Sequence, residues 1–166
     1  MLLNDKEYFD ILGVIKQKIR EAQYRAVLGV NQEQIMLFWN IGKTIIANTK
    51  YGSKFIDNLA RDIQEDFPNL KGYSVRNLKY MRRFAAFFPD IQKVQSLLAL
   101  LSWTHNLRIM DAVTTAAQYE WYAEQTISNG WSVRTLEYHL ETQGYERQAL
   151  PQNKASNYKS VLPSLQ

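Results

Sequence analysis

The chain has 166 residues, 46% hydrophobic and 22% charged, and this balance is typical of a globular protein rather than a disordered one. It contains no cysteine, which excludes disulfides, thiolate catalysis and cysteine-bound zinc. The longest apolar runs, such as residues 97–101, are far shorter than the roughly 20 residues of a membrane span. No basic region precedes an apolar stretch at the start of the chain, so we expect a cytoplasmic protein without a signal peptide.

The net charge of +4 comes from one short segment. Between residues 71 and 83 the chain carries five cations and no acid, and removing these five would leave the remainder at −1. A solvated helix face that only confers solubility usually mixes both signs, whereas a surface for a polyanion concentrates one sign. The segment therefore favours a nucleic-acid partner. Its cations are Lys71, Arg76, Lys79, Arg82 and Arg83.

Apolar residues recur at helical spacing along most of the chain, and no segment shows sustained strand alternation, which predicts an all-α fold. The first helix is expected over the first 30 residues, and Gly29, Val30 and Asn31 are expected to break it. Further helices are predicted over 35–46, 53–66, 74–87, 97–110 with an interruption near Ser102, 114–128 and 132–142.

Three regions follow from this pattern. Residues 1–50 should form N-terminal helices, and residues 51–143 should form tandem helix-turn-helix-like modules that share one core. From residue 144 to 166 the composition becomes polar and loses its periodicity, which predicts a linker or tail.

Residues 72–80 and 130–138 form an internal repeat. The segments GYSVRNLKY and GWSVRTLEY agree at six of nine positions and are both aromatic at a seventh. A turn glycine, an aromatic residue, a capping serine and an apolar Val/Leu pair are typical of a helix-turn-helix. A well-capped helix start produces the same local pattern, so the repeat predicts two modules without implying that both bind DNA.

The outward faces of the two modules differ in charge. Arg76, Lys79, Tyr80 and Arg83 share one face of the first module, and Arg134, Glu137, Tyr138 and Glu141 are the equivalent residues of the second. Contacts to phosphate need cations, so the first module is the expected DNA reader and the second a packing or partner surface. The alternative is a protein-interaction or oligomerisation module whose basic face binds an acidic partner. The predicted DNA-contacting residues are Lys71, Arg76, Asn77, Lys79, Tyr80, Arg82 and Arg83.

We expect no catalytic residue, metal or other cofactor in this chain. The only histidines, His105 and His139, have no cluster of other metal ligands around them. His105 is expected at a helix start, and His139 aligns with Met81 in the repeat, which indicates a packing position. Glu-x-Lys and Asp-x-Lys, the spacing with which a restriction-type nuclease holds Mg²⁺ and its attacking water, do not occur. The four tryptophans are expected to be core anchors: Trp39, Trp103, Trp121 and Trp131.

Short motifs at 37–42, 59–62, 67–72, 76–82, 103–106, 121–123, 129–132 and 145–147 cover residues 30 to 150 in one order. Together they resemble the N-terminal domain of the YhcG family, bacterial proteins whose C-terminal half is a predicted PDDEXK-type nuclease. The resemblance implies a helical targeting domain that acts on DNA, with the nuclease domain as its partner beyond residue 166. That domain is not in this chain, so no catalytic residue is carried over. A homodimer is a further expected partner.

Overall fold

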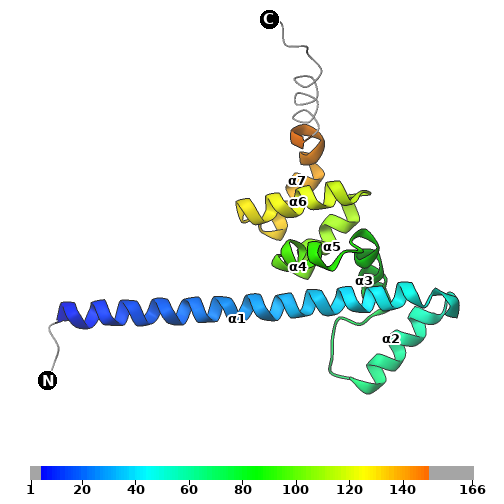
Figure 1. The fold of residues 1–166 in the computed structure, drawn as a ribbon, viewed down its shortest axis with the longest axis horizontal. Coiled ribbons are helices and arrows are strands. Elements are labelled where there is room, and N and C mark those ends of the chain that lie inside the picture. Colours follow the sequence, from blue (N-terminus) through cyan, green and yellow to red (C-terminus); the bar gives the residue numbers. More distant parts are fainter. Residues whose placement is uncertain (1–4, 150–166) are drawn as a thin grey trace, which may run out of the picture.

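The structure is a computed structural model that describes residues 5–149. Most of these residues are helical and no strand occurs among them, so the all-α prediction is confirmed (Figure 1). The helices in chain order are α1 (Asp5–Ala47), the 3-10 turn η1 (Thr49–Tyr51), α2 (Phe55–Asp66), α3 (Val75–Phe87), α4 (Ile91–Ser96), the 3-10 turn η2 (Leu98–Leu100), α5 (Trp103–Ala112), α6 (Ala116–Asn129) and α7 (Val133–Glu141).

Helix α1 is continuous over 43 residues, and the predicted break at Gly29, Val30 and Asn31 is wrong. A glycine inside a helix costs only about 1 kcal/mol relative to alanine, which packing can offset. Asn31 supplies part of that packing, because its amide donates hydrogen bonds of 3.0 and 2.8 Å to the carbonyls of Ala99 and Leu101. The segment from Gly29 to Asn31, which by itself predicts a loop, therefore lies where α1 first contacts the rest of the fold.

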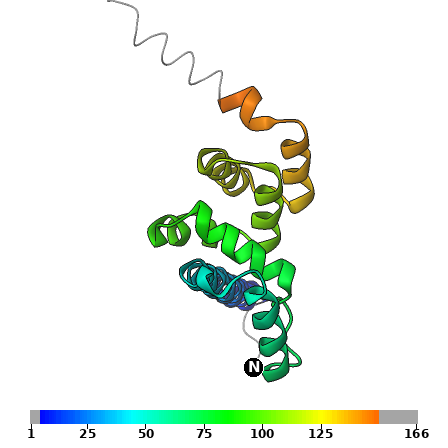
Figure 2. The ribbon, with the colours of Figure 1, turned by 90° about the vertical axis from the view of Figure 1, so that its right-hand side faces the viewer.

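The other helices lie beside the C-terminal half of α1, with α3, η2 and α4 packed directly on it, while its N-terminal half extends beyond them (Figure 1). Figure 2 looks along α1 and shows α3 to α7 rising in successive layers from it, with α2 on the opposite side. The buried residues of α1 begin at Ile35 and continue through Phe38, Trp39 and Ile45. The molecule is thus a helical body, residues 28–149, carried on one end of a long helix.

The core of the body contains one polar network. The hydroxyl of Tyr119 donates to Oδ1 of Asn106 at 2.6 Å, and the Asn106 amide donates to the carbonyls of Leu98 and Ser102. Both side chains are fully buried, and burial raises the pKa of Tyr119 well above its usual value, so the phenol stays a donor. Paired in this way, the two residues join α5, α6 and the η2 segment.

The repeat produces the local geometry expected of it. Ser74 and Ser132 cap α3 and α7, each accepting a 3.1 Å hydrogen bond from the backbone three residues later. The preceding glycines, Gly72 and Gly130, have φ values of 101° and 62°, a region that side chains with a Cβ rarely adopt. The segments that connect the two helices of each module differ in length. Residues 67–74 join α2 to α3, whereas residues 130–132 join α6 to α7. The helix-turn-helix assignment stays a prediction.

Helical structure continues past residue 143, where the linker was expected to begin. Residues 144–149 are helical, Tyr145 packs edge-on against Trp121 at 5.9 Å, and Ala149 is buried. The packed body therefore extends to Ala149, and the rest of the predicted linker, residues 150–166, lies outside the described residues.

Candidate nucleic-acid interface

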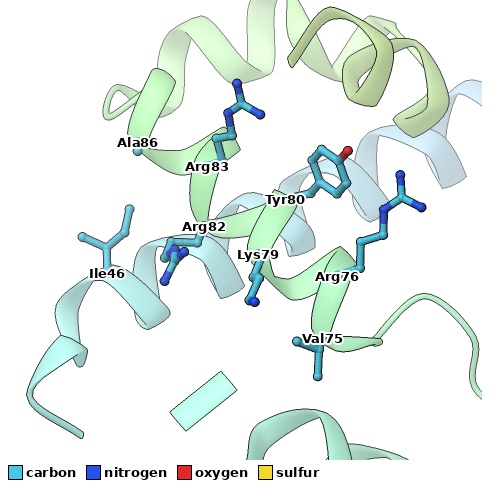
Figure 3. A pocket seen from close by; sticks show the side chains of 8 residues that line it. All are labelled: Ile46, Val75, Arg76, Lys79, Tyr80, Arg82, Arg83 and Ala86. Carbon is cyan, nitrogen blue, oxygen red and sulfur yellow. The ribbon is translucent and has the colours of Figure 1, made fainter. Parts of the chain in front are cut away.

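An open groove of about 860 Å³ runs along α3 (Figure 3). Five of the seven predicted DNA-contacting residues line it. In Figure 3, Arg76 and Arg83 extend from one side of α3 with Tyr80 between them, and Lys79 and Arg82 extend from the other side. Apolar side chains complete the lining: Ile46 from the end of α1, and Val75 and Ala86 from α3.

The opposite face of α3 fixes the helix to the body. Leu78 and Met81, whose spacing puts them on one face of the helix, are fully buried, and Phe84 is fully buried beside them. Gly42 lets α3 approach α1 closely, because a Cβ at that position would collide with the backbone carbonyl of Met81. Burying one large apolar side chain stabilises a fold by about 1.5–3 kcal/mol, and three on one helix hold its cationic face in place.

The groove cations are not neutralised by the protein. Arg76, Lys79, Arg82 and Arg83 are all exposed, and none of them makes an ion pair with any residue between 5 and 149. The guanidinium of Arg83 lies 5.7 Å from the ring centre of Phe87. An exposed cation with no counter-charge is free to pair with an anion from solution, and four on one helix create a strongly positive field.

Tyr80 orders one of these cations. Its hydroxyl donates a 2.6 Å hydrogen bond to Oδ1 of Asp111 on α5, and the guanidinium of Arg76 lies 5.6 Å from the centre of its ring. Hydrogen bonding to Tyr80, followed by charge interactions with Tyr80 and Asp111, raises the pKa of Arg76 above its already high value. Arg76 is therefore charged at any physiological pH and is stacked on a fixed aromatic surface.

Two of the predicted residues lie outside the groove. The amide of Asn77 donates to the carbonyl of Gly72, and its oxygen accepts a 2.8 Å hydrogen bond from the indole of Trp103. Both polar ends of Asn77 are thereby used to join the turn, α3 and α5. Lys71 is exposed in the turn and lines a separate depression with Asp57 of α2.

The second copy of the repeat has a different surface. Its Glu137 accepts a 2.6 Å ion-paired hydrogen bond from Arg108 of α5. The ring of His139 stacks on Trp131 with centroids 3.9 Å apart, and Leu136 is fully buried. These contacts join α7 to the body and agree with the packing role expected of this module.

The remaining candidates for chemistry have structural partners. His105 lies at the start of α5, where its two ring nitrogens contact the hydroxyl of Ser102 at 2.6 Å and the carbonyl of Trp131 at 2.9 Å. Trp39 is buried and donates a 2.7 Å hydrogen bond to the carbonyl of Phe88, and the other three tryptophans pack against the core. Between residues 5 and 149 no three acidic or histidine side chains are grouped as metal ligands.

The family model of the DUF1016 N-terminal domain matches residues 14–147. The chain belongs to this family. It is also similar to a curated protein of Escherichia coli (strain K12) named "Putative nuclease YhcG", with 25% identity over 193 aligned residues. The match covers 95% of this chain and 51% of the relative, so the chain spans about half the relative's length. No solved structure matches significantly.

The family resemblance expected from the short motifs is thus confirmed. In this DUF1016 N-terminal domain, the sequence motifs identified the cations of the groove but not the contribution of Ile46 to its lining or the bond of Tyr80 to Asp111. Ile46 lies 29 residues before Val75 and Asp111 lies 31 residues after Tyr80, and no local pattern connects them to α3. None of the helices between residues 5 and 149 combines the length and the apolar composition that a membrane span needs.

Proposed function

We propose that this chain is a DNA-binding domain and that α3 is its contact helix. The observation that carries the proposal is the groove lining, which contains four exposed cations and no acid. Phosphate contacts supply most of the affinity of proteins for DNA, and they need cations that are not neutralised by an internal ion pair. Among residues 5–149 no ion pair involves the cations of α3, whereas Glu137 and Glu141 make the equivalent face of α7 unsuitable.

The residues of α3 suit different parts of a duplex. Three of the cations have flexible side chains that can reach phosphate oxygens: Lys79, Arg82 and Arg83. The lysine presents a compact ammonium group, and the arginines present planar guanidinium groups that can donate two hydrogen bonds at once. Arg76 lies in the first turn of α3, and recognition helices commonly reach base edges with their N-terminal residues. Because Tyr80 holds the guanidinium of Arg76, this arginine loses less conformational freedom on binding than a mobile one would.

The likeness to a relative named as a nuclease suggests what the binding is for. The chain corresponds to about half of that relative, and its described residues hold no metal-ligating cluster. We infer a targeting domain that brings a nuclease domain to DNA in the cytoplasm, with catalysis performed by residues outside this chain.

A second candidate function is binding of an acidic protein segment. Its support is the apolar part of the groove, where Ile46, Val75 and Ala86 lie beside the cations. DNA backbones present few apolar groups, whereas an amphipathic acidic helix would use both kinds of surface.

A salt titration separates the two candidates. Residues 1–166 are mixed with one random-sequence duplex at several salt concentrations, and the triple variant Arg76→Ala/Lys79→Ala/Arg83→Ala is measured in parallel. Each neutralised phosphate contributes about −0.9 to the slope of log K against log salt, so the triple variant should flatten the slope by up to about 3.

Arg134→Ala is the matched control, because Arg134 occupies the position of Arg76 in the second copy of the repeat. It should leave affinity and slope nearly unchanged. Equal slopes for the wild type and the triple variant, with unchanged circular dichroism, would reject DNA binding by α3 and favour the acidic-protein candidate.

A further inference from the structure

Residues 7–27 of α1 expose many large apolar side chains to solvent. Residues 7–27, here called the arm, are exposed apart from the half-buried Leu12. Within the described part of the chain, no hydrogen bond, ion pair or ring contact joins the arm to the body, and Figure 1 shows it extending alone. Its exposed large apolar residues are Tyr8, Phe9, Ile11, Val14, Ile15, Ile19, Tyr24 and Val27.

Part of this apolar surface forms a regular stripe. Tyr8, Leu12, Ile15, Ile19, Ala22 and Ala26 follow one another at alternating intervals of four and three residues. This is the spacing of the a and d positions of a coiled coil, and it persists here for almost three heptads. A single helix of about 20 residues gains nothing from such a stripe unless a second helix covers it.

The body of the same chain does not lie on the side of the stripe. At about 100° per residue, the body-facing residues Ile35, Phe38 and Gly42 point about 150° away from the mean direction of the stripe around the helix axis. The stripe therefore faces nearly opposite to the body, so a second molecule could approach it without meeting the body of the first.

We propose that the arm pairs with the arm of a second copy of this chain in an antiparallel coiled coil. In antiparallel pairing a positions meet d positions, and a two-fold axis beside Gln17 places Tyr8 against the partner copy's Ala26. The same register places Leu12 against Ala22 and Ile15 against Ile19. Each large side chain of the outer layers faces a small one, and four isoleucines, two from each copy, fill the centre.

The extent of the stripe also favours the antiparallel arrangement over the parallel one. Beyond Ala26 the same side of α1 carries Glu33 and Asn40. A parallel pair that continued along α1 would place Glu33 on Glu33 and Asn40 on Asn40, and it would stack Ala22 and Ala26 on their own copies. An antiparallel pair centred on Gln17 overlaps only over the apolar part.

The pairing has a distinctive response to salt. Lys16 and Lys18 flank the stripe near the two-fold axis, and each comes close to its own copy. Because like charges repel and salt screens them, dimerisation should strengthen as salt rises. DNA binding should weaken over the same range, so the dimer can be tested without DNA and independently of the proposed function.

Sedimentation over a range of concentrations gives the mass of residues 1–166 in solution. This mass tests whether the apolar stripe of the arm mediates dimerisation. We expect a dimer for the wild type and a monomer for Ile15→Glu, which buries a charge in the central layer. Val14→Glu is the matched control, since Val14 neighbours Ile15, has a similar exposed fraction (57% against 49%) and lies off the stripe. A monomeric wild type, a dimeric Ile15→Glu or a monomeric Val14→Glu would each overturn the proposal.

Disulfide trapping tests the orientation, because the chain contains no cysteine of its own. Tyr8→Cys and Ala26→Cys are prepared as separate variants and oxidised alone and as a mixture. The antiparallel register predicts a covalent dimer only in the mixture. Covalent dimers in each separate variant would show a parallel pair and overturn the antiparallel assignment.

Discussion

The hydroxyl of Tyr80 on α3 donates a 2.6 Å hydrogen bond to the carboxylate of Asp111 on α5. This bond connects the cationic helix to the C-terminal end of α5 and fixes the ring on which Arg76 stacks. A single side chain thus serves both the fold and the proposed DNA contact.

Removing only the hydroxyl tests both roles. Tyr80→Phe should lower the free energy of unfolding by about 1 kcal/mol, the usual net value of one hydrogen bond, because Asp111 then loses its donor. The ring remains beside Arg76 but loses the hydrogen bond that fixes it, so DNA affinity should also fall modestly. Denaturant titration and the duplex binding assay measure the two effects. Tyr138→Phe, at the same position of the repeat and 60% exposed, should leave stability unchanged; an equal loss in both variants would contradict this role of Asp111.

Replacing Gly42 should destabilise the fold although alanine is the better helix former. The new Cβ would collide with the carbonyl of Met81, and overpacking of this kind costs about 1–3 kcal/mol, more than the roughly 1 kcal/mol gained in helix propensity. Gly29→Ala is the control on the same helix, because no atom lies within 4 Å of the added Cβ. Thermal unfolding should show a lower midpoint for Gly42→Ala and an equal or higher one for Gly29→Ala. A rise for both would mean that the approach of α3 to α1 is not tight.

Leu136 anchors the second copy of the repeat. It is fully buried, so Leu136→Ala should lower the free energy of unfolding by about 2–5 kcal/mol through lost burial and the cavity that remains. Glu141→Lys on the exposed side of the same helix should change it by less than about 0.5 kcal/mol. Urea titration of both variants provides the measurement, and a loss below about 1 kcal/mol for Leu136→Ala would show that α7 contributes little to the core.

The chain alone should not cleave DNA with the help of Mg²⁺. The Glu-x-Lys and Asp-x-Lys spacings are absent from the sequence, and the described residues contain no group of three acidic or histidine ligands. Supercoiled plasmid incubated with pure protein and Mg²⁺ should remain intact. Cleavage that a chelator abolishes and that copurifies with the protein through several columns would contradict this expectation.

Local chemistry explains which features could be predicted from the sequence. The serine caps and turn glycines of the repeat located the starts of α3 and α7, because a cap depends on residues within one turn of the helix. The buried positions of α3 followed from periodicity for the same reason.

Features that depend on distant segments could not be predicted. Gly29 signals a break locally, yet α1 continues because Asn31 bonds to carbonyls about 70 residues away in the sequence. Asn77 was expected to contact DNA, but Trp103 of α5 and the turn carbonyl of Gly72 occupy its polar atoms. Periodicity in the arm showed an apolar stripe and could not show that the body of the chain leaves it uncovered.

Because α1 is continuous through Gly29, its length fixes the distance between the features at its two ends. One end carries the arm and the other carries Ile46 of the cationic groove, 29 residues beyond the proposed two-fold axis. At about 1.5 Å per residue, two grooves in the antiparallel dimer would lie about 90 Å apart, which is about 26 base pairs of a straight duplex. A break at Gly29 would have left that separation variable. If the proposed dimer binds DNA through both grooves, the number of residues in the unbroken helix α1 sets the spacing between the two bound stretches of DNA.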